Sequence, residues 1–157
     1  SQEFNMICSG AGAFESLRLE KGYRSLGADI HTNTNPYEAG LGFTVKLKKE
    51  TNFIGKEALI KLKQATSSKK LCCMVMEDDE GMALGKEPIY DKNSKPVGYV
   101  TSANYGYYVD KHILYGYLPS EHSKEGTKLE VGYFGKRHPV VVTKEPLLDP
   151  ESKRLKS

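Results

Sequence analysis

The sequence lacks the features that define several large classes of protein. No apolar run among its 157 residues approaches the roughly 20 residues that a membrane-spanning helix needs. It has no glycine-rich nucleotide-binding loop, and no serine or cysteine stands in a nucleophile elbow. The histidines are scattered without metal-ligand spacing, at His31, His112, His122 and His138. We therefore predict no membrane partner, no metal ligand and no catalytic residue in this chain.

Cysteine is scarce, and neither sign of charge dominates. Cys72 and Cys73 are adjacent in an apolar run and Cys8 stands alone, which is neither a disulfide framework nor a zinc pattern. We interpret all three as structural thiols of a reducing compartment such as the cytosol or the mitochondrial matrix. The net charge of +3 is mild and the lysines are spread along the chain, so no nucleic-acid partner is predicted.

The stretch of residues 15–43 carries the clearest functional signal. Good helix formers and the absence of proline predict that it begins as a helix, which extends to near Gly27. Four residues fall on one side of this helix: Ala13, Leu17, Glu20 and Arg24. If Leu17 faces inward, Glu20 is a carboxylate near the interior, which needs a partner or a function. One interpretation is an ion pair between Glu20 and Arg24 on a half-exposed helix; the other is a binding site.

Other signals in the first 68 residues are weaker. Gly22 would be unfavourable in mid-helix, which suggests that another group approaches the backbone closely there. Apolar residues at 4–8 and alternation at 43–48 predict two strands, and residues 56–64 predict a second helix. A strand at 4–8 has no hairpin partner nearby. We therefore expect the chain to be the C-terminal piece of a longer protein.

The character of the chain changes after a polar segment at 65–70, the best candidate for a domain linker. Short β-branched or aromatic runs separated by turn residues then predict an all-β barrel or sandwich. The predicted strands are 71–76, 87–90, 97–101, 112–118, 128–134 and 138–143. The prolines at 146 and 150 and the basic end predict a tail on the surface or disordered.

Tyrosines cluster in one hairpin-like segment of this second part. They are Tyr105, Tyr107, Tyr108, Tyr115 and Tyr117. Such residues form cross-strand pairs that hold a sheet together, which is the more general interpretation. They also stack on flat heterocycles, and the residues alone do not decide between the two.

Motifs along nearly the whole chain resemble a known family. They lie at residues 16–24 (SLRLEKGYR), 27–29, 36–41, 53–59, 85–90, 97–98, 101–102 and 115–117. The sequence resembles the folate-binding T-protein of the glycine cleavage system, and still more the C-terminal part of the flavin-dependent dimethylglycine and sarcosine dehydrogenases. The resemblance implies an α+β remnant at 1–68, followed by an antiparallel β-barrel at 69–157.

The resemblance also implies roles for single residues. A glutamate at the place of Glu20 binds the pterin ring of tetrahydrofolate in this family, and Lys21 follows it in the dehydrogenase branch. Leu84 stands where T-protein has an arginine near the start of the barrel. We take Glu20, Lys21 and Leu84 as the candidate cofactor-binding residues. FAD is expected only in an absent N-terminal part, so the isolated chain should bind no flavin.

What the resemblance implies for function is the C-terminal folate-binding part of a dimethylglycine or sarcosine dehydrogenase. Its partners would be tetrahydrofolate and the rest of the same polypeptide, in the mitochondrial matrix if eukaryotic and otherwise in the cytoplasm. Two alternatives stay open. One is a non-catalytic relative that acts as an interaction module, of the type of the regulatory subunit of pyruvate dehydrogenase phosphatase, and the other is an aminomethyltransferase proper. Fold likeness alone does not decide among them.

Overall fold

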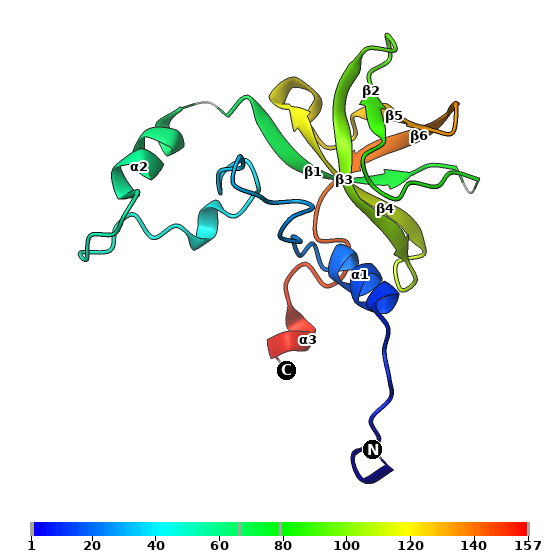
Figure 1. The fold of residues 1–157 in the computed structure, drawn as a ribbon, viewed down its shortest axis with the longest axis horizontal. Coiled ribbons are helices and arrows are strands. Elements are labelled where there is room, and N and C mark those ends of the chain that lie inside the picture. Colours follow the sequence, from blue (N-terminus) through cyan, green and yellow to red (C-terminus); the bar gives the residue numbers. More distant parts are fainter. Residues whose placement is uncertain (1, 66, 79, 157) are drawn as a thin grey trace.

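The computed structural model describes residues 2–65, 67–78 and 80–156. Figure 1 shows a barrel with the helix α1 (Ala11–Glu20) against one end, while α2 (Lys56–Gln64) stands apart on an extended arm. No helix of the described residues is long and apolar enough to cross a membrane. The barrel therefore holds the main core, and α1 is the helix of the first part that packs against it.

Six strands close the barrel in the order β1-β4-β3-β2-β5-β6, with every neighbouring pair antiparallel. They are β1 (Lys69–Met76), β2 (Pro88–Tyr90), β3 (Pro96–Gly106), β4 (Lys111–Pro119), β5 (Lys128–Tyr133) and β6 (Lys136–Thr143). Alternate apolar side chains fill the interior, among them Met74, Ile89, Val100, Leu114 and Val140. Closure removes the exposed edges that an open sheet would leave. The predicted antiparallel barrel is confirmed.

A second apolar cluster lies outside the barrel, between its wall and α1. Leu19 is fully buried there against Ile113 and Tyr115 of β4, together with Leu71 and Cys73 of β1. This contact selects the face of α1 that turns inward.

The helix differs from its prediction in two ways. It ends at Glu20 rather than near Gly27, because Gly22 adopts a left-handed φ of +74° that ends the helix. Gly22 is thus a terminator and not a mid-helix residue. Leu17 is 59% exposed, so the predicted inward side is wrong for that residue. Ser16, Leu19 and Glu20 are buried in its place because they face β3 and β4.

Both strands predicted in the first part are wrong. The short 3-10 helices Gln2–Phe4 and Gly42–Thr44 overlap those segments, and the described remainder of each is turn or coil. Alternation of apolar residues needs a neighbouring strand to form a ladder. Within the described part of residues 2–68, the isolated bridge between Leu26 and Ile30 is the only such pairing. The second helix has its predicted bounds, Lys56–Gln64, and buries none of its residues.

The C-terminal segment is more than a surface tail. After β6 the chain returns to α1, where the backbone N–H of Leu148 donates to the carbonyl of Glu20 at 3.0 Å. Leu147 packs against the cluster outside the barrel, and the short helix α3 (Lys153–Lys156) follows. We call residues 147–156 the C-terminal strap, because they connect the end of α1 to the rest of the molecule.

Candidate functional site

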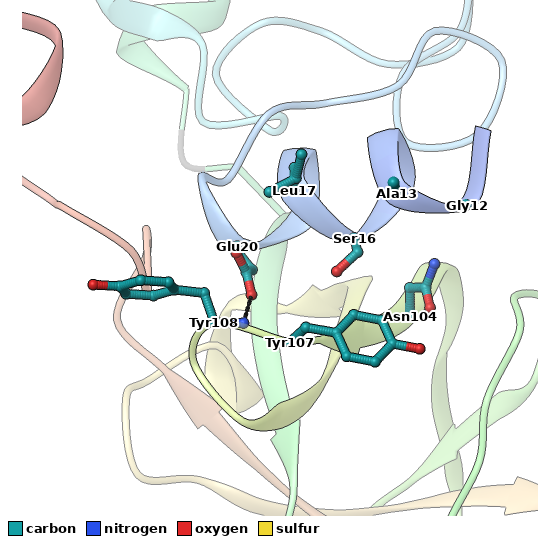
Figure 2. Close-up of a pocket in the computed structure, with 8 residues that line it drawn as sticks. All are labelled: Gly12, Ala13, Ser16, Leu17, Glu20, Asn104, Tyr107 and Tyr108. Atoms are coloured by element: carbon teal, nitrogen blue, oxygen red, sulfur yellow. Dashed lines mark hydrogen bonds between the residues drawn. The ribbon is translucent and has the colours of Figure 1, made fainter. Parts of the chain in front are cut away.

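A pocket of about 690 Å³ lies between α1 and the β3–β4 hairpin. This volume is within the range of roughly 300–1,000 Å³ that small-molecule sites occupy. Figure 2 shows α1 on one side and the tyrosines of the hairpin on the other. The lining residues are Gly12, Ala13, Ser16, Leu17, Glu20, Asn104, Tyr107 and Tyr108. The lining is mostly apolar and aromatic, with a single charged side chain.

That charged residue, Glu20, is only 1% exposed. Its Oε1 accepts hydrogen bonds from the backbone N–H groups of Tyr108, at 2.7 Å, and Val109, at 3.3 Å. Its Oε2 is also buried, yet it has no hydrogen-bond partner among the described residues. A buried carboxylate oxygen without a donor is costly, so the site is built to receive one.

The ion pair that the sequence left open for Glu20 is not formed. Arg24 instead places both of its terminal nitrogens on Glu145, at 2.5 and 3.0 Å, and donates to the carbonyl of Ala39. Burial lowers the pKa of the Arg24 guanidinium, but the hydrogen bond to Glu145 and the nearby negative charges together outweigh burial and keep the pKa above its ordinary value. Arg24 is therefore committed to the junction with the C-terminal segment, and Glu20 is free for the pocket.

The glycine that ends β3 makes this position of Glu20 possible. A Cβ at Gly106 would lie 2.6 Å from Cδ1 of Ile113 and 3.0 Å from Cγ of Glu20. The hairpin can therefore approach α1 closely only because residue 106 has no side chain. Gly106 was not among the residues predicted to form a site, although its place between Tyr105 and the pair Tyr107 and Tyr108 is visible in the sequence.

The tyrosine cluster divides between the two roles that the sequence left open. Tyr115 and Tyr117 are buried in the cluster between the barrel and α1. Tyr107 and Tyr108 are exposed and line the pocket, where Tyr107 packs edge-on against Tyr105 with ring centroids 5.2 Å apart. Arg154 lies over one face of the Tyr108 ring, 4.7 Å from its centroid.

A buried polar network fixes α1 against the barrel. Asp29 accepts hydrogen bonds from Nη1 of Arg18 on one oxygen and from Oγ1 of Thr101 on the other, each at 2.6 Å. The hydroxyl of Ser16 also donates to the carbonyl of Tyr105 at 2.6 Å. These bonds connect α1 to β3 and so set the width of the pocket.

The other two candidate residues lie outside the pocket. Nζ of Lys21 donates to the carbonyl of Asp149 at 2.6 Å and to Oγ of Ser152 at 3.1 Å. Leu84 is 69% exposed in the loop before β2, where its backbone N–H donates to Glu87 at 2.9 Å. The structure therefore does not bring the three candidates together around one cavity.

Two family models match the chain. The glycine cleavage T-protein C-terminal barrel domain matches residues 69–149, and the GCVT N-terminal domain matches residues 1–49. The first match covers the whole barrel, and the second covers α1 with Glu20.

Several characterised proteins are similar to the chain. Human mitochondrial dimethylglycine dehydrogenase is 39% identical over 153 residues, which are 98% of this chain and 18% of that protein. Human mitochondrial sarcosine dehydrogenase is 43% identical over 113 residues, 72% of this chain and 12% of that protein. An aminomethyltransferase from Prochlorococcus marinus (strain NATL1A) is 40% identical over 137 residues, 87% of this chain and 36% of the relative. The chain thus spans a small part of the length of each.

A crystal structure shares the fold. The glycine cleavage system aminomethyltransferase T from Bartonella henselae superposes with a TM-score of 0.81 at 27% sequence identity. The match covers 88% of this chain and 38% of that protein. The likeness therefore extends beyond the barrel into the first part of the chain.

Proposed function

This chain belongs to the glycine cleavage T-protein family, and we propose that it is the folate-binding C-terminal part of a flavin-dependent dimethylglycine or sarcosine dehydrogenase. Its role would be to present tetrahydrofolate, which captures the one-carbon unit released when an N-methyl group is oxidised. The observation that carries the proposal is the buried, unpartnered Oε2 of Glu20 in an aromatic-walled pocket.

The pocket residues fit a pterin ring. One edge of a pterin presents two adjacent donors, a ring N–H and an exocyclic amine, and carboxylates form strong charge-assisted hydrogen bonds with such groups. Oε1 of Glu20 already accepts two backbone N–H groups, so Oε2, with its two lone pairs, is the oxygen left to accept both donors of the ligand. The exposed ring of Tyr107 offers a face on which a flat ring stacks.

Bound tetrahydrofolate would supply the two amine nitrogens that take up the one-carbon unit. The residues of this chain hold and orient the pterin and exclude water from its polar edge. Oxidation of the amine needs FAD, which we assign to the part of the polypeptide outside this chain. We place the protein in the mitochondrial matrix, as its dimethylglycine and sarcosine dehydrogenase relatives are mitochondrial.

An aminomethyltransferase is the second candidate. It is favoured by the 40% identity to the Prochlorococcus marinus protein and by the fold shared with aminomethyltransferase T. Both candidates use the same pocket for the pterin, so they differ only in what delivers the one-carbon unit. Discrimination therefore needs the full-length protein.

The test is the Glu20→Ala variant of the full-length protein, titrated with tetrahydrofolate. Losing hydrogen bonds to a charged group costs about 1.5–3 kcal/mol, so the affinity should fall about tenfold to somewhat over a hundredfold. Glu20→Gln should also bind poorly, because its amide N–H₂ faces the donors of the ligand. Amine oxidation should persist in both variants, with free formaldehyde released in place of one-carbon capture.

Glu15→Ala is the matched control, since Glu15 lies on the same helix, is half-exposed and pairs with Arg18 outside the pocket. It should keep the affinity of the wild type. Equal affinity of wild type and Glu20→Ala would remove the folate assignment of Glu20. A full-length protein without flavin that accepts an aminomethyl group from a carrier protein would favour the second candidate.

A further inference from the structure

Besides Glu20, Ser16 and the two tyrosines, Asn104 is the remaining polar side chain that lines the pocket. The hydroxyl of Ser16 is already bonded to the carbonyl of Tyr105. Asn104 lies on β3 and lines the pocket. In Figure 2, the side chain of Tyr107 lies between Glu20 and Asn104. Its role is not accounted for by the barrel core, because it is only half-buried.

The orientation of the Asn104 amide is determined by its neighbour. Its side-chain oxygen accepts a hydrogen bond from the backbone N–H of Tyr105 at 2.8 Å. A backbone N–H is a donor, so the atom facing it must be Oδ1, and the amide cannot be flipped. Nδ2 then carries two N–H donors, and no partner for it exists among the described residues. The pocket thus has a free acceptor on Glu20 and free donors on Asn104.

The spacing of these two groups follows from the strand. Gly106 lies two residues after Asn104, so both positions face the same side of β3. A Cβ at Gly106 would lie 3.0 Å from Cγ of Glu20, which places the glutamate beside that position. A two-residue step along a strand spans roughly 6.6 Å. One flat heterocycle is long enough to meet both the carboxylate and the amide.

We propose that Asn104 is a specificity-determining residue that selects a pteridine with a carbonyl, rather than an amino group, at ring position 4. This rests on the proposed function, in which Glu20 takes the ring N–H and the exocyclic amine. The 4-position is adjacent to that ring N–H, so its substituent faces the next polar group along the pocket. The N–H groups of Asn104 donate to a 4-carbonyl, whereas a 4-amino group would meet them donor to donor.

The experiment compares two probes, folic acid and aminopterin. Aminopterin has an amino group in place of the 4-carbonyl, and its adjacent ring nitrogen has no hydrogen. Because Glu20 is the same in every variant, a change in the ratio of the two affinities reports on Asn104. Each probe is titrated by calorimetry into the full-length protein and into its Asn104→Asp and Asn104→Ala variants. Aspartate keeps an oxygen for the Tyr105 N–H but presents a second oxygen to the pocket. The preference for folic acid should therefore fall by about tenfold or more and turn toward aminopterin. Alanine should weaken folic acid and leave aminopterin nearly unchanged.

Asn93→Asp is the matched control, because Asn93 lies in an exposed turn between β2 and β3 and does not line the pocket. It should keep the wild-type ratio. Thermal melting checks folding, and the ratio of two affinities is insensitive to a uniform loss of folded protein.

If the wild type binds both probes and Asn104→Asp keeps the same ratio, Asn104 does not select the ligand and the proposed function still stands. If Asn104→Asp does not fold, the alanine variant decides: an unchanged ratio overturns the role of Asn104. If the wild type binds neither probe, the folate assignment fails and this inference fails with it.

Discussion

Glu20 illustrates what a single residue reveals before the fold is known. Its carboxylate on a helix predicted a partner or a function, and the structure shows two backbone donors on one oxygen and none on the other. Those donors belong to Tyr108 and Val109, which are 88 and 89 residues away along the chain. Helix periodicity describes only local neighbours, so it could not identify them, and it also led to the wrong choice of Leu17 as inward.

The thiols provide a prediction at the same scale. Burial raises the pKa of Cys73 to about 12 and that of Cys72 to about 11. At pH 8 both therefore remain protonated, and the thiolate is the reactive form. Cys8 differs from the interpretation made for all three, because it is exposed. A chromogenic disulfide reagent should titrate one thiol in the native chain and all three after denaturation.

The control for this titration is Cys8→Ser, which should leave the native chain almost unreactive. Its denatured form should still show two thiols. Rapid labelling of native Cys8→Ser would mean that β1 opens readily, and that the barrel wall is less stable than its burial indicates.

At the scale of elements, the strands were far more predictable than the first part of the chain. Each barrel strand pairs with two neighbours that the sequence also encodes, so alternation and turn residues located them to within a few positions. The long β3 (Pro96–Gly106) was predicted to end at 101, because a register shift between Val100 and Ser102 interrupts its alternation. The division at 68/69 into two domains stays a prediction, although β1 begins at Lys69.

The C-terminal strap contacts both elements that form the pocket. It bonds to the carbonyl of Glu20 through Leu148 and to Lys21 through Asp149, and Arg154 contacts the hydroxyl and ring of Tyr108. It therefore touches α1 and the hairpin, the two elements that position the carboxylate. Its importance could not be predicted from composition, since prolines and basic residues are typical of a free tail.

This arrangement predicts how Lys21 acts. If Lys21 works by holding the strap, Lys21→Met should lower folate affinity by about three- to tenfold, the equivalent of one hydrogen bond. The same substitution should have no further effect in a protein truncated after Leu148, because its partners Asp149 and Ser152 are then absent. A double-mutant cycle tests this: folate affinity is measured for Lys21→Met, for the protein truncated after Leu148, and for the protein that carries both changes. Additive losses would instead show that Lys21 contacts the ligand directly.

At the scale of the whole molecule, apolar burial is unevenly distributed. Among the described residues before Lys69, the buried hydrophobic side chains are Leu19 and Ala39. Many large apolar side chains of the same part are exposed, including Phe4, Met6, Ile7, Phe14, Leu26, Phe43 and Ile54. Exposed apolar surface on this scale marks an interface. The relatives are several times longer than this chain. We expect the remainder of such a polypeptide to cover these apolar residues, including those of the arm, residues 42–64, that carries α2.

Ile54 provides the test, because its side chain is 103% exposed two residues before the start of α2. In the 157-residue chain, Ile54→Asp should change the melting temperature by no more than about 2 °C, since exposed substitutions rarely exceed 0.5 kcal/mol. In the full-length protein, the same change would bury an unpaired charge, so melting should fall clearly and folate affinity with it.

Phe134→Asp is the control for Ile54→Asp. Phe134 is equally apolar and 90% exposed, but it lies in the turn between β5 and β6. In the closed barrel, these two strands lie opposite β3 and β4, which contact α1. It should be tolerated in both the short chain and the full-length protein. If Ile54→Asp is tolerated in the full-length protein as well, the arm is a solvent-exposed appendage. The apolar residues before Lys69 would then need a separate partner, because the rest of the polypeptide does not cover them.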